Sequence, residues 1–109
     1  MDMTALIKTC AAFEDAQECF PFGPLPVCYK AGPKHRLFAQ IYPDKVTLRC
    51  TRLMGEVWRS EHPYCLSRGY HCPPRQAPYF ITAALENTPD ALLMEMLSHA
   101  HQCVLTGQK

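Results

Sequence analysis

Apolar residues recur at helical spacing near both ends of the chain. The first such stripe predicts a helix over about residues 4–13, which Thr4 can cap. Its apolar positions are Leu6, Ile7, Cys10 and Ala11. The last stripe predicts a helix that Asn87 or Thr88 can cap and that Gly107 can end. Its members are Leu93, Met96, Leu97, Ala100 and Val104.

Shorter runs between these helices alternate in polarity and are separated by turn residues, which predicts strands of an antiparallel sheet. These strands are Val27–Ala31, Leu37–Tyr42, Val46–Thr51 and Tyr79–Glu86. A short helix over Arg52–Glu61 precedes the last of them, and His62-Pro63 ends it because a residue before proline avoids the helical region. Residues 62–78 then form a long loop, a feature that often carries a binding function.

The alternation also predicts which side chains share a face of the sheet. In the third strand, Val46, Leu48 and Cys50 lie on an apolar face, and Arg49 lies on the opposite one. In the second strand, one side would hold Leu37, Ala39 and Ile41, and the other Phe38, Gln40 and Tyr42. We therefore expect one apolar face and one mixed face that carries Lys30, Gln40 and Arg49.

These elements predict an α+β protein forming a single domain over residues 1–109. We expect an antiparallel sheet of four or five strands with helices packed on one face, in the order α-β-β-β-α-β-α. A length of 109 residues, with 48% apolar and 19% charged residues, is typical of one globular domain.

The seven cysteines indicate the compartment. No signal peptide and no membrane-spanning run is visible in the sequence. An odd number of widely spaced cysteines without a secretory signal favours free thiols and a reducing compartment. We therefore expect a cytoplasmic protein with no membrane association.

Charge is unevenly distributed along the chain. Residues 27–75 hold nine basic and three acidic residues, or +6, and the flanks hold two basic and seven acidic residues, or −5. The sum gives the net charge of +1. A basic middle segment can present an attractive face to an anion, although the charges of the folded chain can also intermix on a solvated surface.

Several short motifs, taken in order, resemble the MmcQ/YjbR-like family over nearly the whole chain. They are Pro21-Phe22-Gly23, Leu37-Phe38-Ala39, Val46-Thr47-Leu48-Arg49-Cys50, Gly69-Tyr70-His71 and Pro89-Asp90-Ala91-Leu92-Leu93. The resemblance implies a CyaY-like fold, also called a double-wing arrangement, in a family that is commonly labelled DNA-binding. Because fold similarity is a weak warrant for function, the residues themselves must carry that hypothesis.

The first functional hypothesis is therefore nucleic-acid (DNA) binding through the mixed sheet face and the long loop. Arginines neutralise phosphates, and aromatic rings stack on bases. The candidate residues are Lys30, Arg49, Arg68, Tyr70, His71 and Arg75. The sequence pI of about 7.6 is low for a dedicated nucleic-acid domain.

The alternative is a module that binds a small molecule or a protein under the loop 62–78. Its pocket would be lined by Trp58, Tyr64, Tyr70 and Tyr79, although the same rings can simply anchor the loop to the core.

We predict no metal or cofactor and no catalytic activity. Two groups hold residue types that zinc accepts: His62, Cys65, His71 and Cys72, and then His99, His101 and Cys103. Neither contains the Cys-x-x-Cys pair typical of zinc sites. The chain also lacks a glycine-rich phosphate loop, a serine elbow and a paired-carboxylate motif.

Overall fold

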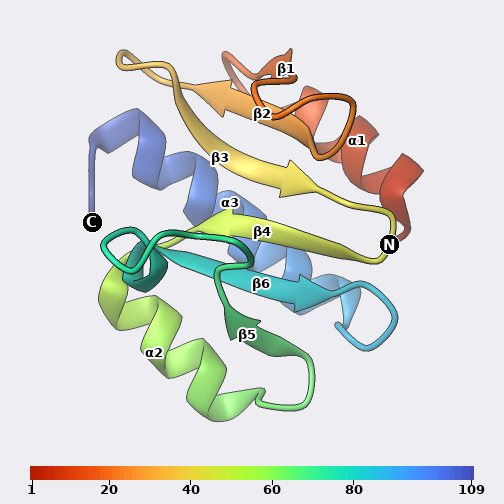
Figure 1. Ribbon diagram of the computed structural model, residues 1–109, viewed down its shortest axis with the longest axis vertical. Coiled ribbons are helices and arrows are strands. Elements are labelled where there is room, and N and C mark those ends of the chain that lie inside the picture. Colours follow the sequence, from red (N-terminus) through yellow and green to blue (C-terminus); the bar gives the residue numbers. More distant parts are fainter.

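Three helices and six strands form the protein, which we describe from a computed structural model of residues 1–109 (Figure 1). The helices are α1 (Met3–Ala11), α2 (Arg52–Glu61) and α3 (Asp90–Thr106), with a short 3-10 turn, η1, at Ala77–Tyr79. The strands are β1 (Gln17–Cys19), β2 (Val27–Ala31), β3 (Arg36–Ile41), β4 (Lys45–Arg49), β5 (Leu66–Arg68) and β6 (Phe80–Ala84). None of the helices is long and apolar enough to cross a membrane.

All six strands pair antiparallel in one sheet, in the order β1-β2-β3-β4-β6-β5. The α+β class is confirmed, but the expected four or five strands and the order α-β-β-β-α-β-α are wrong. The two unforeseen strands, β1 and β5, are the edges of the sheet and have three residues each. Three residues are too few to show an alternation, so the pattern left them inside loops.

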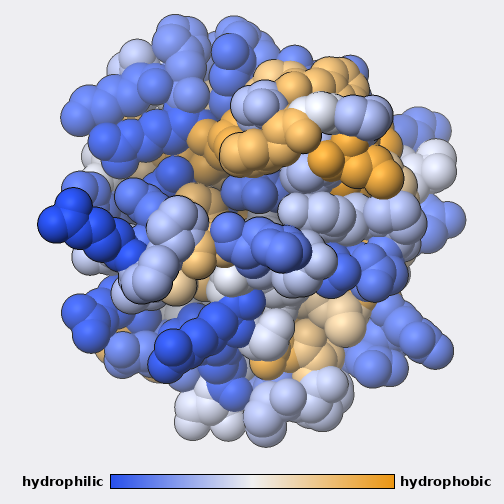
Figure 2. Space-filling view, viewed as in Figure 1, coloured by the Kyte–Doolittle hydropathy of each residue, from blue (hydrophilic) through white to orange (hydrophobic).

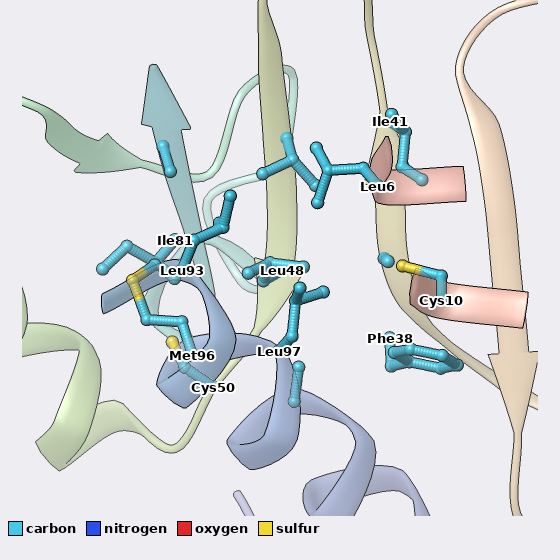
Figure 3. Packing of buried hydrophobic residues seen from close by; sticks show 14 of the residues in the cluster. Leu6, Cys10, Phe38, Ile41, Leu48, Cys50, Ile81, Leu93, Met96 and Leu97 are labelled. Atoms are coloured by element: carbon cyan, nitrogen blue, oxygen red, sulfur yellow. The ribbon is translucent and has the colours of Figure 1, made fainter. Parts of the chain in front are cut away.

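Helices α1 and α3 cover one face of the sheet, and the hydrophobic core lies between these helices and that face (Figure 3). Strands β3, β4 and β6 direct Ile41, Leu48 and Ile81 into this layer, where each is fully buried. Helix α3 places Leu93 and Leu97 against them. The opposite face has no helix over it, and in Figure 1 only loops cross it.

A β-bulge in β3 changes which residues reach the core. Tyr29 pairs with Ala39, but the next residue of β2, Lys30, pairs with Leu37. Phe38 therefore has no partner on β2. Phe38 therefore faces the core, fully buried, rather than lying with Gln40 on the uncovered face. The expectation that Leu37 belongs to the core side is likewise wrong, and a single extra residue in the strand explains both errors.

The predicted helices are present, but two of their caps differ. The Asp2 carboxylate, not the Thr4 hydroxyl, caps α1 by accepting a hydrogen bond from Ala5 N at 2.8 Å. Thr88 does not cap α3, since its hydroxyl donates to the Ala84 carbonyl oxygen at 2.6 Å. Gly107 ends α3 in the left-handed conformation as predicted.

The prediction that residues 62–78 form one long loop is wrong, because part of this segment has regular structure. Its first part forms β5, which pairs with β6 through Leu66 and Ala83. Its last part is η1, which leads directly into β6. Residues 62–65 form a turn before β5, and the longest irregular part is residues 69–76, which we call the cleft loop.

Candidate functional site

A cleft of about 880 Å³ lies on the uncovered face of the sheet. It is bounded by the β1–β2 loop on one side and the cleft loop on the other, which approach the viewer in Figure 1. Figure 2 shows the same face, with hydrophobic side chains gathered over the β1–β2 loop next to hydrophilic ones. The lining residues are Phe22, Leu25, Pro26, Arg36, Leu37, Gln40, Tyr42, Arg49, Tyr70, His71, Cys72, Pro73, Gln76, Tyr79, Phe80 and Lys109.

Arg49 forms the most firmly held cationic group of this cleft. It is the last residue of β4, and its Nε donates a hydrogen bond to the Leu37 carbonyl oxygen at 2.9 Å. Its guanidinium carbon lies 4.7 Å from the centre of the Phe80 ring on the neighbouring strand. These two contacts fix the planar group while part of it still faces the cleft.

The side chains that line the cleft carry positive charge and no acidic group. Arg36, Arg49 and Lys109 are among its sixteen lining residues, which include no aspartate or glutamate. The three ion pairs of the structure join other groups. Burial, and next the nearby charge of Arg36, lower the pKa of Arg49. Two guanidinium groups in one cleft with no acidic side chain in its lining are an arrangement that an anion stabilises.

The wall opposite the β1–β2 loop is aromatic and is tied to the sheet. The rings of Tyr42 and Tyr70 meet edge-on at 5.3 Å, and His71 follows at 4.0 Å from Tyr70. The Lys45 ammonium lies 4.3 Å from the centre of the Tyr70 ring. The backbone N–H of Tyr70 also donates to the Thr82 hydroxyl at 2.9 Å. The cleft loop is thus held by both its side chain and its backbone at this residue.

The Thr82 hydroxyl is itself part of a buried polar pair beneath the cleft loop. It lies 2.9 Å from the hydroxyl of Thr47 on the neighbouring strand. Both threonines are buried, although they belong to the face that has no helix. The cleft loop therefore takes the place of a helix over this part of the sheet.

Three of the six residues predicted to bind nucleic acid line this cleft. They are Arg49, Tyr70 and His71. Lys30, Arg68 and Arg75 are not among the lining residues. Arg68 pairs with Ile81, a core residue, so its side chain leaves the sheet on the helix side. Arg68 is therefore on the opposite face of the sheet from the cleft.

The predicted aromatic pocket is confirmed for only two of its rings. Tyr70 and Tyr79 line the cleft. The prediction is wrong for Trp58, which is buried in the core. Its ring lies edge-on to the His99 ring, with 5.0 Å between the ring centres. The prediction is also wrong for Tyr64, which lines a separate and smaller cavity beside β5.

The cleft contains important residues that the sequence analysis missed. Phe22 and Leu25 belong to a proline-rich loop, and Arg36 is the first residue of β3, one residue before the predicted strand begins. For Phe22 and Leu25, the concentration of prolines indicates an ordered loop that can expose apolar side chains, and Phe22 also lies in one of the motifs of the family resemblance.

The two histidine and cysteine groups do not form metal sites. The structure brings no three histidine, cysteine, aspartate or glutamate side chains together in a way that could hold a metal ion. In the second group, His99 Nε2 instead accepts a hydrogen bond from Thr51 N at 3.0 Å. The same ring nitrogen lies 3.5 Å from Sγ of Cys103.

Two solved structures have the same fold. A crystal structure of a Deinococcus radiodurans protein with a DUF419 domain superposes with a TM-score of 0.82 at 26% identity, covering 99% of this chain and 82% of that one. A Pseudomonas syringae protein superposes with a TM-score of 0.75 at 12% identity, covering 95% of this chain and 99% of that one, and it supports the fold alone. No curated protein matches the chain in sequence. The model of the YjbR family matches residues 11–103, so the resemblance found in the short motifs is confirmed and the chain belongs to the YjbR family.

Proposed function

We propose that this protein binds a small anionic molecule in the cleft between the β1–β2 loop and the cleft loop. The observation that carries the proposal is the charge of the side chains in the lining, which include two arginines and a lysine but no aspartate or glutamate. An unbalanced pair of guanidinium groups favours a bound carboxylate or phosphate, since both can accept two parallel hydrogen bonds from arginine.

Size and rigidity support the same proposal. A volume of about 880 Å³ falls within the range of cavities that hold small molecules and cofactors. Arg49 is fixed before any ligand arrives by its bond to Leu37 and its contact with Phe80, so little side-chain entropy is lost on binding. Preorganised donors of this kind are typical of ligand sites.

DNA binding through the sheet face is less well supported. It depends on Lys30, Arg68 and Arg75 acting together with Arg49, and these three lie outside the cleft. A single held arginine and two aromatic side chains offer an anion site of limited extent rather than a track for a phosphate backbone.

The test compares two aromatic anions with their neutral counterparts by isothermal titration calorimetry. The probes are AMP with adenosine, and phenyl phosphate with phenol. We expect each anion to bind more tightly than its neutral counterpart, and Arg49→Gln to weaken the anions roughly ten- to hundred-fold, which is the range for a charge-assisted hydrogen bond. The matched control is Arg68→Gln, an exposed arginine on the helix side of the sheet, which should leave both affinities unchanged.

Two results would overturn the proposal. One is that neither anion binds more tightly than its neutral counterpart. The other is that Arg68→Gln weakens binding as much as Arg49→Gln does. A single-stranded oligonucleotide whose affinity falls equally in Lys30→Gln, Arg68→Gln and Arg75→Gln would restore the nucleic-acid hypothesis instead, and that binding should weaken steeply with salt.

The proposed role is binding without catalysis, in a reducing cytoplasm. The one thiol in the cleft, Cys72, has a pKa raised by burial, with the charge of Arg49 opposing that rise. A thiol of this kind is a poor nucleophile at neutral pH. All seven cysteines are free, which suits a reducing compartment.

A further inference from the structure

An exposed phenyl ring stands at the mouth of the cleft. Phe22 lines the cleft, yet 63% of its surface is accessible. The loop that carries it also holds Pro21, Pro24 and Pro26, which restrict the backbone on either side of the ring. Large apolar side chains that remain exposed on an ordered segment are typical of binding surfaces.

A second partly exposed ring, that of Tyr70, lies on the opposite side of the cleft. It is fixed by the Lys45 ammonium over its ring and by the bond from its backbone N–H to Thr82. The cleft therefore has aromatic rings on both sides, and Arg49 and Arg36 also line it. A flat apolar group bound there would cover both rings while a charged group reached the arginines.

We infer that the ligand of this cleft is an aromatic anion, with a flat ring system and a phosphate or carboxylate in the same molecule. The ring system packs against Phe22 and Tyr70, and the anionic group pairs with Arg49 and Arg36. This inference rests on the proposed function, and it adds that the ring contributes to affinity as well as the charge. Stacking on an aromatic side chain is worth enough to separate a ring-bearing from a ringless anion.

The test uses two sugar phosphates, of which one carries an aromatic base and the other does not. AMP and ribose 5-phosphate are titrated by calorimetry into the wild-type protein, into Phe22→Ala and into Phe20→Ala. We expect AMP to bind roughly ten-fold more tightly than ribose 5-phosphate to the wild type. Phe22→Ala should remove most of that preference by weakening AMP alone. Phe20 is the matched control, because it is 51% exposed on the same loop but does not line the cleft.

The outcomes separate this inference from the proposed function. Equal affinities for the two phosphates, or equal losses in Phe22→Ala and Phe20→Ala, would overturn the aromatic ligand while leaving an anion site that depends on Arg49. A failure of both phosphates to bind the wild type, or binding of both that Arg49→Gln does not weaken, would overturn the proposed function and with it the inference. Because Phe22 is exposed, its removal should leave the melting temperature almost unchanged, which checks that the variant is folded.

Discussion

The two faces of the sheet are built from alternate residues of the same strands, yet different forces hold them. On the covered face, Leu48 and Ile81 are fully buried against α3 and are fixed by packing alone. On the uncovered face, Thr47 and Thr82 are buried through a hydrogen bond, and Arg49 is fixed by a carbonyl and a ring. We therefore expect changes on the covered face to alter stability, and changes on the uncovered face to alter binding first.

The adjacent residues Phe38 and Leu37 test this contrast most strongly, because the bulge sends them to opposite faces. The Phe38 ring packs edge-on against Phe13 at 5.9 Å and His101 at 5.3 Å. We expect Phe38→Ala to lower the free energy of unfolding by about 3–5 kcal/mol, the usual cost of removing a buried phenyl ring. Urea unfolding followed by circular dichroism measures this loss.

Leu37→Ala is the matched control for the bulge. Leu37 is only half-buried and lines the cleft, so its truncation should cost about 1 kcal/mol while changing the affinity for AMP. A larger loss of stability in Leu37→Ala than in Phe38→Ala would show that the bulge is misplaced and that the two residues have exchanged faces.

This pair also shows how far the sequence could predict the fold. Where strict alternation holds, as at Val46, Leu48 and Cys50, the residues predicted to be apolar and inward are buried. The bulge at Phe38 could not be foreseen, because it depends on how β3 pairs with β2 rather than on either strand alone. The short edge strands β1 and β5 were missed for the same reason, since partner strands define them.

The candidate site was predictable where its residues follow the alternation of a strand or lie in the long loop expected to bind. Arg49 follows from alternation in β4, and Tyr70 and His71 from their place in the long loop. Arg68 seemed equivalent in sequence, but β5 turns it to the helix side, which a loop assignment could not reveal. Phe22 and the cleft loop line the same cleft although they are far apart in sequence, and no local pattern records such an arrangement.

A smaller effect is expected from the buried hydroxyl pair on the uncovered face. Thr82→Val removes the acceptor for the Tyr70 N–H and the partner of the Thr47 hydroxyl. Leaving such groups unpaired costs about 1–3 kcal/mol, which thermal or urea unfolding detects. Because Tyr70 is a wall of the cleft, we also expect weaker AMP binding by calorimetry.

Thr47→Val is the control that leaves the Tyr70 bond in place. It should destabilise the protein less than Thr82→Val and have little effect on AMP affinity, since Thr82 still accepts from Tyr70 N. The double variant should cost less than the sum of the two, because both single changes break the same bond. Full additivity would mean that the two hydroxyl groups do not interact.

The smallest predicted effect concerns pH and lies on the helix side of the sheet. Burial lowers the pKa of His99 below its ordinary value of 6.5, opposed by the charge of Glu95, and the neutral ring accepts the Thr51 N–H bond. The unfolded chain therefore binds more protons than the folded one as the pH falls below 6.5. The contribution to stability is complete above that pH and is lost as the pH falls through the lowered pKa of the folded state.

His99→Gln should reduce this dependence, because the amide oxygen can still accept the Thr51 bond without titrating. From pH 7.5 to pH 5.0, the urea midpoint should fall less in the variant than in the wild type. The corresponding difference in the free energy of unfolding should be less than the ~1.4 kcal/mol per pH unit that one proton can contribute. An unchanged difference between the two midpoints would mean that His99 is protonated equally in both states. In that case the Thr51 bond would not depend on a neutral ring, and the helix side would owe its stability to packing alone.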